Sequence, residues 1–262
     1  MQASVIILTK NQKELLRQSL PILLNQEIIH DNEIIIVDSG STDGAVEYIK
    51  TLPVKLIQIQ PEKFSFPGSF NLGAKQATGE ILIRLSGDAI PQNKDFIFEM
   101  ISPFQEASVG GVFGRYVISG KPGYEFPNFW KKWMFPDNKI IYPPIKNPFL
   151  NFEVSLRSVL FAGGCCALRR KLWVKRPFNE KLIAAEDSDY GFFLRLMGYE
   201  VVYNPRAIVL HEHPIVRNHP NKFSWLIHFG ISRWQFLHIK ELIKLYLDRF
   251  VFKKYDDLLF SK

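Results

Sequence analysis

The chain has 262 residues, 47% of them hydrophobic, which fits one large domain with a substantial core, alone or with a helical appendage. No run of 18 uncharged apolar residues occurs, and the start lacks a basic region and a cleavage site, so we expect neither a transmembrane helix nor a secretory signal. The formal charge is +7, and ten basic against five acidic residues lie from Val201 onward. Anionic lipid and acidic substrates fit this charge, whereas no zinc-finger or RNA-recognition signature supports nucleic acid.

Short apolar runs alternate with helical spacing through the first third of the chain. Four runs are predicted to be buried strands: Ser4–Leu8, Glu33–Val37, Val54–Ile59 and Glu80–Leu85. Three helices are expected between them: Asn11–Asn25 with Asn11 as its cap, Ala45–Lys50 and Ser69–Ala77. This order predicts an α/β fold, with a mostly parallel sheet and helices on both of its faces.

The pattern changes after Asp88. Residues 119–150 are rich in proline and aromatic residues, which predicts a long irregular excursion. Extended segments follow at Phe161–Leu168, Glu200–Tyr203 and Ala207–Leu210, with a helix at Ala185–Met197. Cys165 and Cys166 are adjacent, so we expect buried free thiols, as in a protein of the reducing cytosol.

Residues 222–262 form a basic, aromatic C-terminal extension with helical spacing. Trp225, Trp234 and Phe250 alternate with lysines and arginines along it. Cationic faces that carry tryptophan and phenylalanine suit a helix lying on an anionic membrane surface. The alternative is that these aromatic side chains pack on residues 1–221 or on a second subunit of a homodimer.

Asp38 follows the buried run Glu33–Val37 and opens a small polar loop that ends at Gly44. Ligands of open parallel sheets bind at the carboxyl ends of the strands, where Asp38 stands. A carboxylate in this position can accept hydrogen bonds from a ribose or from a base N–H group. The alternative is that Asp38 only caps the following helix.

Three further sites combine acids or histidine with strand or helix ends. Asp88 lies just beyond a strand and can hold Mg²⁺ or Mn²⁺, or merely cap its loop. Glu186, Asp187 and Asp189 open a helix, where the helix dipole favours acids and where one carboxylate can serve as a general base. His211 ends an apolar run and is either a metal or phosphate ligand or a buried, hydrogen-bonded histidine.

Five segments in this order resemble glycosyltransferase family 2, whose members are inverting enzymes with the GT-A fold. The resemblance covers roughly residues 3–214. The segments are Ser4–Asn11, Val37–Gly44, Asn71–Ala74 with Thr78–Glu80, Asp88, and Glu186–Asp187. Together with Gly114–Arg115, the segments Ser41–Gly44 and Asp88–Pro91 are most similar to rhamnosyltransferase-type members.

The resemblance implies a role for each matched residue. Asp187 would be the catalytic base, with Glu186 beside it, and Asp88 and His211 would bind the divalent metal, Mg²⁺ or Mn²⁺. The Gly163–Gly164 pair would let the acceptor or the donor sugar approach the backbone. The residues expected to bind the donor are Thr9, Lys10, Asn11, Asp38, Ser41, Asn71, Gly73, Lys75, Ser86 and Gly87.

The implied activity is transfer of a sugar from a nucleoside-diphosphate donor to a hydroxyl of a glycan or lipid-linked acceptor, in cell-surface polysaccharide synthesis. The enzyme would be cytoplasmic and would lie peripherally on the inner face of the cell membrane. Residues 1–221 would form the catalytic domain and residues 222–262 the extension.

Two other readings of the chain stay open. Ser86 stands where the family's D-x-D motif has its first acid, so a non-catalytic glycan-binding or nucleotide-binding homologue is one alternative. A nucleotidyltransferase, which shares the alternating fold, is the other, although Thr9–Gln12 lacks the glycine-rich loop of those enzymes. No G-x-G-x-x-G or G-x-S-x-G motif supports a dinucleotide oxidoreductase or a serine hydrolase.

Overall fold

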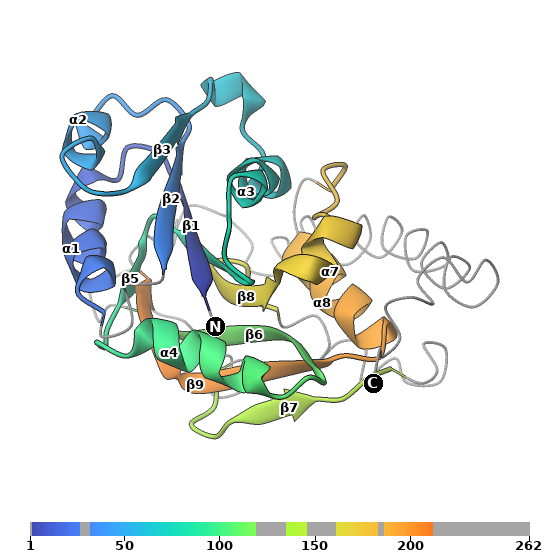
Figure 1. Cartoon of the computed structure of the whole chain (residues 1–262). Coiled ribbons are helices and arrows are strands. Elements are labelled where there is room, and N and C mark those ends of the chain that lie inside the picture. The colour runs from blue at the N-terminus through green and yellow to red at the C-terminus, as the bar shows by residue number, and fades with distance from the viewer. Residues whose placement is uncertain (1, 27–31, 119–134, 146–160, 183–185, 212–262) are drawn as a thin grey trace, which may run out of the picture.

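One mixed sheet organises the computed structural model, which describes residues 2–26, 32–118, 135–145, 161–182 and 186–211 (Figure 1). Its strand order is β3-β2-β1-β4-β8-β6-β9-β5, and β7 pairs with β9. The strands are β1 (Ala3–Thr9), β2 (Glu33–Asp38), β3 (Lys55–Gln58), β4 (Ile81–Ser86), β5 (Ala89–Pro91), β6 (Val109–Ile118), β7 (Ile140–Tyr142), β8 (Cys165–Arg169) and β9 (Glu200–His211). The α-helices are α1 (Lys13–Leu24), α2 (Ala45–Ile49), α3 (Phe66–Lys75), α4 (Phe96–Ile101), α7 (Arg170–Lys175) and α8 (Glu186–Leu196), and the 3-10 helices are η2 (Pro61–Lys63) and η3 (Ser102–Gln105).

The first half of the sheet is parallel and the second half is mixed. Strands β3, β2, β1 and β4 all run in the same direction, as the alternating sequence predicts. Strand β8 is antiparallel to both β4 and β6, whereas β9 is parallel to β6. The α/β fold is therefore confirmed, and the parallel arrangement holds for the part of the chain in which strands and helices alternate.

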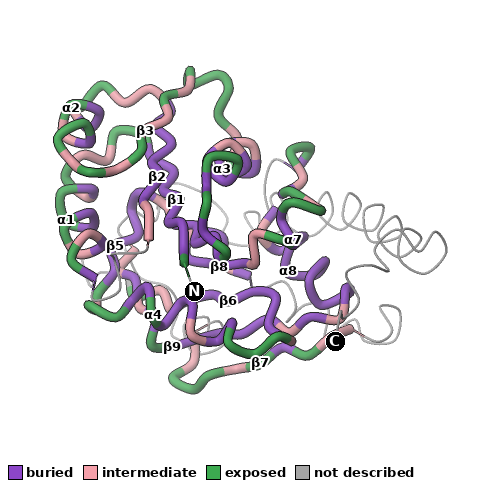
Figure 2. Tube along the Cα trace, in the orientation of Figure 1, coloured by how far each residue is buried: buried purple, intermediate pink, exposed green. Residues whose placement is uncertain are grey.

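Helices cover both faces of the sheet, also as predicted. Val5 and Ile7 of β1 belong to a buried cluster with residues of α1, α2 and α4, and Ile6 and Leu8 to a cluster with residues of α3, α7 and α8. This alternation follows from the two-residue period of a strand, because successive side chains point to opposite faces. Figure 2 shows the result as buried chain along the central strands and exposed chain on the outer helices.

Several elements differ from the prediction. Strand β6 was not predicted, because Gly110, Gly111 and Gly114 dilute its apolar pattern. Helix α3 begins three residues earlier than expected, since the Ser65 hydroxyl accepts a hydrogen bond from the Gly68 backbone N–H at 3.1 Å. The two extended segments expected near residue 205 form one strand, β9, whose pairing with β6 shifts register at Gly114.

Both cysteines are free and buried, as expected. In the described part of the chain, no helix is long and apolar enough to cross a membrane. The C-terminal extension and most of the expected excursion at 119–150 lie outside the described residues.

Candidate active site

The carboxyl ends of three strands meet at one edge of the sheet. In the strand register, Thr9 of β1 lies opposite Asp38 of β2, and Leu8 lies opposite Ser86 of β4. The loops that carry the predicted nucleotide and metal residues therefore leave the sheet side by side. This is the edge at which open α/β sheets bind their ligands.

Asp38 is fully buried and organises the loop that follows it. Its carboxylate accepts hydrogen bonds from the backbone N–H groups of Gly40 and Ser41, each at 3.0 Å, and from the Ser41 hydroxyl. Helix α2 is reached only after Gly44, and the Asp43 carboxylate accepts from the Ala45 N–H at 3.0 Å at its start. These contacts give Asp38 the role of holding its own loop, and the side-chain hydrogen bond at the start of α2 comes from Asp43.

The prediction that Asn11 caps the first helix is wrong. Helix α1 begins at Lys13, and Asn11 precedes it in a left-handed conformation with φ of 51°. Its side-chain oxygen accepts a hydrogen bond from the Thr42 N–H at 2.7 Å, and its own N–H donates to the Ser41 hydroxyl at 2.8 Å. Asn11 therefore joins the loops after β1 and β2, while Lys10 beside it is exposed.

The expected donor residues on α3 lie apart from this edge or face the protein. The Asn71 amide donates to the Phe178 carbonyl and to Glu180, both at 2.9 Å, and accepts from Trp173 Nε1 at 2.9 Å. A Cβ on Gly73 would come within 2.6 Å of Ile6, so this glycine lets the helix approach the sheet. These contacts favour a structural role for both residues.

Lys75 is the clearest departure from the expected donor site. It ends α3, which starts beside the carboxyl edge of the sheet and returns the chain to the beginning of β4. A hydrogen bond from the Thr78 N–H to Glu33, the first residue of β2, fixes this end of the helix at the amino edge. The topology therefore places Lys75 at the edge of the sheet opposite the one at which we expect the donor.

Asp88 and His211 come together from distant parts of the chain. Asp88 follows β4, His211 ends β9, and His211 Nε2 lies 3.3 Å from Asp88 Oδ1. The ring of Tyr116 from β6 packs edge-on against the imidazole, with ring centroids 5.1 Å apart. Among the described residues, no group of three or more His, Cys, Asp and Glu side chains gathers as a metal site. A carboxylate and an imidazole are nevertheless donors that Mn²⁺ accepts, so this pair fits part of a metal coordination shell.

Asp187 lies at the start of α8 and is partly exposed. Its Oδ2 atom accepts a hydrogen bond from the Gly163 N–H at 2.8 Å, and its Oδ1 atom accepts from the Ser188 N–H at 2.7 Å. Two backbone donors therefore hold the carboxylate in place while part of it stays accessible. Such a group can accept a proton from a bound hydroxyl.

Glu186 has a different environment from its neighbour. It is 4% exposed, and its Oε1 atom lies 2.7 Å from a guanidinium nitrogen of Arg84 in β4. Burial raises the pKa of Glu186, the positive charge of Arg84 opposes this shift, and the negative charge of Asp187 adds to it. This arrangement favours a supporting role for Glu186 over the predicted direct part in catalysis.

The two glycines before β8 connect Asp187 with the strand ends. The Gly164 carbonyl accepts a hydrogen bond from the Ser86 N–H at 3.0 Å, and a Cβ on Gly164 would approach the Tyr116 hydroxyl to 2.4 Å. A Cβ on Gly163 would likewise approach Asp187 Oδ2 to 2.7 Å. The two glycines thus leave space for the side chains of Asp187 and Tyr116, where we expected them to leave space for a sugar.

The remaining expected donor residues line the same edge. The Thr9 hydroxyl donates to Gln12 Oε1 at 3.0 Å, and Gly87 packs so closely on both residues that a Cβ would clash with them. The Ser86 hydroxyl oxygen is buried and has no hydrogen-bond partner among the described residues. A continuous series of contacts therefore runs from Asp187 through the glycines and Ser86 to Tyr116, His211 and Asp88.

Arg84 and Tyr116 are site residues that the sequence analysis missed. For Arg84 a signal existed, because a single arginine in an otherwise apolar strand must find a counter-charge if the strand is buried. For Tyr116 the sequence offered no such signal, because strand β6 itself was not predicted.

A model of the family described as "Glycosyl transferase family 2" matches residues 4–176. The chain belongs to this family. The match includes the loops after β1, β2 and β4 and ends before Asp187 and His211. Family 2 membership favours the transferase reading over the nucleotidyltransferase alternative.

Named relatives of this family 2 chain include two O-antigen proteins. The O-antigen chain rhamnosyltransferase RfbN of Salmonella typhimurium is 26% identical over 216 residues, which cover 81% of this chain and 67% of the relative. The O-antigen biosynthesis protein RfbC of Myxococcus xanthus is 25% identical over 254 residues, which cover 89% of this chain. The chain spans only 19% of the length of RfbC.

The fold also matches that of solved structures. The mannosyltransferase PcManGT from Pyrobaculum calidifontis, solved in complex with GDP-Man and Mn²⁺, superposes with a TM-score of 0.65 at 22% identity. The superposition covers 92% of this family 2 chain and 64% of PcManGT. The GT-A fold expected from the sequence is thereby confirmed.

Proposed function

We propose that this chain transfers a sugar from a nucleoside-diphosphate donor to a hydroxyl group of a glycan or lipid-linked acceptor, in the synthesis of a surface polysaccharide. The observation that carries the proposal is the partly exposed Asp187, which is connected through Gly163, Gly164 and Tyr116 to the Asp88–His211 pair at the ligand-binding edge. Family membership and the O-antigen relatives support the same activity. A deoxyhexose such as rhamnose is the donor sugar that these relatives favour.

In the proposed reaction Asp187 accepts the proton of the acceptor hydroxyl. The hydroxyl oxygen forms a bond to the anomeric carbon as the bond from that carbon to the diphosphate breaks, which inverts the configuration. The N–H groups of Gly163 and Ser188 orient the carboxylate before the acceptor arrives. General bases of this kind contribute about 10²–10⁴-fold to the rate.

Asp88 and His211 would hold a divalent metal, with Mn²⁺ the better match to a site that includes an imidazole. When bound, the metal would neutralise charge on the leaving diphosphate. The loops of Thr9–Asn11, Asp38–Ser41 and Ser86–Gly87 would surround the nucleotide. Their hydrogen bonds to one another provide a preformed surface for it.

A panel of nucleotide sugars tests this proposal directly. Each donor is added to the chain with and without Mn²⁺, and thermal shift reports binding while release of nucleoside diphosphate reports turnover. We expect one donor to raise the melting temperature in the presence of Mn²⁺ and to be slowly hydrolysed. Binding without release would indicate the non-catalytic homologue, and the absence of binding by every donor would contradict the proposal.

For the C-terminal extension we propose contact with an anionic membrane surface, where a lipid-linked acceptor would be found. The proposal rests on sequence alone, in which basic residues alternate with Trp225, Trp234 and Phe250. Liposome sedimentation of the full chain and of a chain ending at Asn221 tests it. Recovery of both in the supernatant with anionic vesicles at low salt would reject membrane contact, and light scattering would then show whether the extension joins two subunits.

A further inference from the structure

Arg84 is a buried charge beside the candidate base. It lies within the apolar strand β4, is 4% exposed, and its guanidinium carbon lies 5.6 to 5.9 Å from the ring centroids of Phe66, Phe70 and Phe178. The Nη2 atom lies 2.7 Å from Glu186 Oε1. The Nη1 atom is buried and has no hydrogen-bond partner within the described ranges.

The second guanidinium nitrogen and the Asp187 carboxylate both lie next to Gly163. The point that a Cβ on Gly163 would occupy lies 3.0 Å from Arg84 Nη1 and 2.7 Å from Asp187 Oδ2. Arg84 therefore pairs with the first carboxylate of the Glu186–Asp187 sequence. Its charge also interacts with the second: burial lowers the pKa of Arg84, but the negative charges of Glu186 and Asp187 raise it above its usual value. Only a glycine at residue 163 leaves room for this approach.

The other ionisable groups around these carboxylates are neutral near pH 7. Burial raises the pKa of the Cys166 thiol in β8 well above its usual value, and burial likewise raises the pKa of the Tyr116 hydroxyl in β6. The ionisable groups that remain to interact with one another are Glu186, Asp187 and Arg84. Without Arg84, two adjacent carboxylates would repel each other, and one of them would hold a proton at higher pH than usual.

We propose that Arg84 is a positioning residue for the transfer reaction: it fixes and neutralises Glu186, so that Asp187 remains the ionised carboxylate that faces the acceptor. This inference rests on the proposed function of Asp187 as the base. It assigns Glu186 the role of a counter-ion for Arg84. It also gives a reason for the arginine inside β4, where an apolar residue would pack at lower cost.

The pH dependence of kcat/KM separates this role from simple packing. Arg84→Gln should move the acid limb of the profile upward by about one pH unit, because Asp187 then titrates beside an uncompensated carboxylate. Glu186→Gln should move the limb downward, because Arg84 then acts on Asp187 alone. The double variant Arg84→Gln/Glu186→Gln should return the limb close to its wild-type position, and Arg84→Lys should keep it there at reduced kcat.

Helix α8 offers a matched control. Arg176 Nη2 lies 2.7 Å from Asp189 Oδ2 in a second buried pair, and Asp189 is fully buried. Arg176→Gln removes a guanidinium that is also paired with a carboxylate but is somewhat more exposed, so it should lower the melting temperature without moving the acid limb. If Arg84→Gln lowers stability and leaves the limb where it was, Arg84 is only a packing residue and the inference is overturned.

The test still decides if Arg84→Gln does not fold or if the wild-type chain shows no transfer. If Arg84→Gln does not fold, Glu186→Gln alone decides, since an unmoved acid limb in that variant would also overturn the inference. If the wild-type chain shows no transfer, the proposed function fails, but the charge relationship can still be measured by ¹³C NMR of labelled aspartate, with Asp187→Asn to assign the signal. A higher titration midpoint of Asp187 in Arg84→Gln supports the inference, and an unchanged midpoint contradicts it.

Discussion

Asp38 and Asp187 are carboxylates at the same edge of the sheet, but their surroundings differ. Asp38 is fully buried, and its own loop donates three hydrogen bonds to it. Asp187 accepts two backbone hydrogen bonds and is partly exposed, next to the buried Arg84–Glu186 pair. A satisfied, buried carboxylate stabilises a loop, whereas a fixed and accessible one is available for proton transfer.

The difference shows that a residue in a family motif is not necessarily a ligand contact. Asn71 and Gly73 resemble Asp38 in this respect, because their contacts are also to the protein itself. Asp88, His211 and Asp187 are the residues that we propose take part in the chemistry. Substitutions should therefore fall into two classes, one that changes turnover and one that changes stability.

The largest effect is expected for Asp187→Asn. The amide keeps the size of the side chain but cannot accept the proton, so transfer should fall about 10²–10⁴-fold. Donor affinity, measured by calorimetry, should change little. Asp189→Asn on the same helix is the control, and a wild-type transfer rate in the Asp187 variant would remove Asp187 from the mechanism.

Asp38→Ala should show the opposite pattern. It removes a buried carboxylate and its three hydrogen bonds, which should lower the free energy of unfolding by about 2–4 kcal/mol. Urea unfolding measures this loss, with Asp43→Ala, in the exposed part of the same loop, as the milder control. If stability is unchanged and nucleotide binding is abolished, Asp38 contacts the donor directly, and the contrast drawn between Asp38 and Asp187 is wrong.

Asp88→Ala and His211→Ala should weaken Mn²⁺-dependent binding of the nucleoside diphosphate. Removal of an outer-shell partner of a metal ligand lowers metal affinity by about tenfold or more. Removal of a side chain that binds the metal itself should lower it by at least as much. Calorimetric titrations with and without Mn²⁺ measure the effect. Equal diphosphate affinity in both titrations of the wild-type chain would show that the pair has no metal role.

Glu33 offers a smaller effect at the opposite edge of the sheet. Burial alone would raise its pKa, but hydrogen bonds from Lys55, Ser4 and Thr78 lower the pKa to about 2. A lowered pKa in the folded state stabilises the protein above about pH 4.5 and ceases to do so as the pH falls toward 2. Glu33→Gln should therefore cost about 1 kcal/mol at pH 7, after allowance for solvent screening, and less at pH 3.

Urea unfolding of Glu33→Gln at the two pH values measures this difference, with the exposed Glu47→Gln as control.

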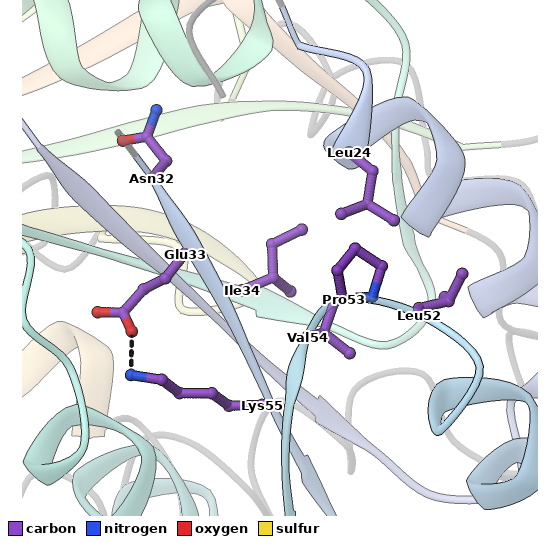
Figure 3. A pocket seen from close by; sticks show the side chains of 8 residues that line it. All are labelled: Leu24, Asn32, Glu33, Ile34, Leu52, Pro53, Val54 and Lys55. Atoms are coloured by element: carbon purple, nitrogen blue, oxygen red, sulfur yellow. Dashed lines mark hydrogen bonds and ion pairs between the residues drawn. The ribbon is translucent and has the colours of Figure 1, made fainter. Parts of the chain in front are cut away.

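Glu33 and Lys55 also line a hollow of about 530 Å³ between α1, β2 and β3 (Figure 3). Its other lining residues are Leu24, Asn32, Ile34, Leu52, Pro53 and Val54. Since the hollow lies at the amino ends of β2 and β3, the same variant should leave turnover unchanged, and a loss of turnover would contradict the placement of the active site.

The parallel half of the fold could be predicted from the sequence because its strands are short apolar runs that alternate with helices up to β4. Strand β6 could not, since its three glycines are needed for close packing, for example of Gly111 against Leu194 and Phe161, and such contacts leave no local pattern. The cap of α1 was mispredicted for a related reason. The side-chain oxygen of Asn11 accepts a hydrogen bond from the Thr42 N–H, which is distant in the sequence, and not from the N–H groups of the helix.

The sequence points to candidate site residues where acids or histidine stand at the ends of elements, as Asp88 and His211 do at strand ends and Asp187 does at the start of α8. The contact between Asp88 and His211 depends on the pairing of β5 with β9, which the sequence does not indicate. The position of Lys75 could not be predicted, because a motif gives the spacing along a helix but not the edge of the sheet at which the helix ends. The role of Arg84 required the ion-pair geometry with Glu186.

The most direct test of the account is the anomeric configuration of the first product, followed by ¹H NMR at early times after mixing the chain with its donor and an acceptor. A single accessible carboxylate that acts as a base predicts one in-line displacement and therefore an inverted configuration relative to the donor. A retained configuration would require a different mechanism, such as a covalent intermediate or front-face attack, and would contradict the assignment of Asp187 as the base.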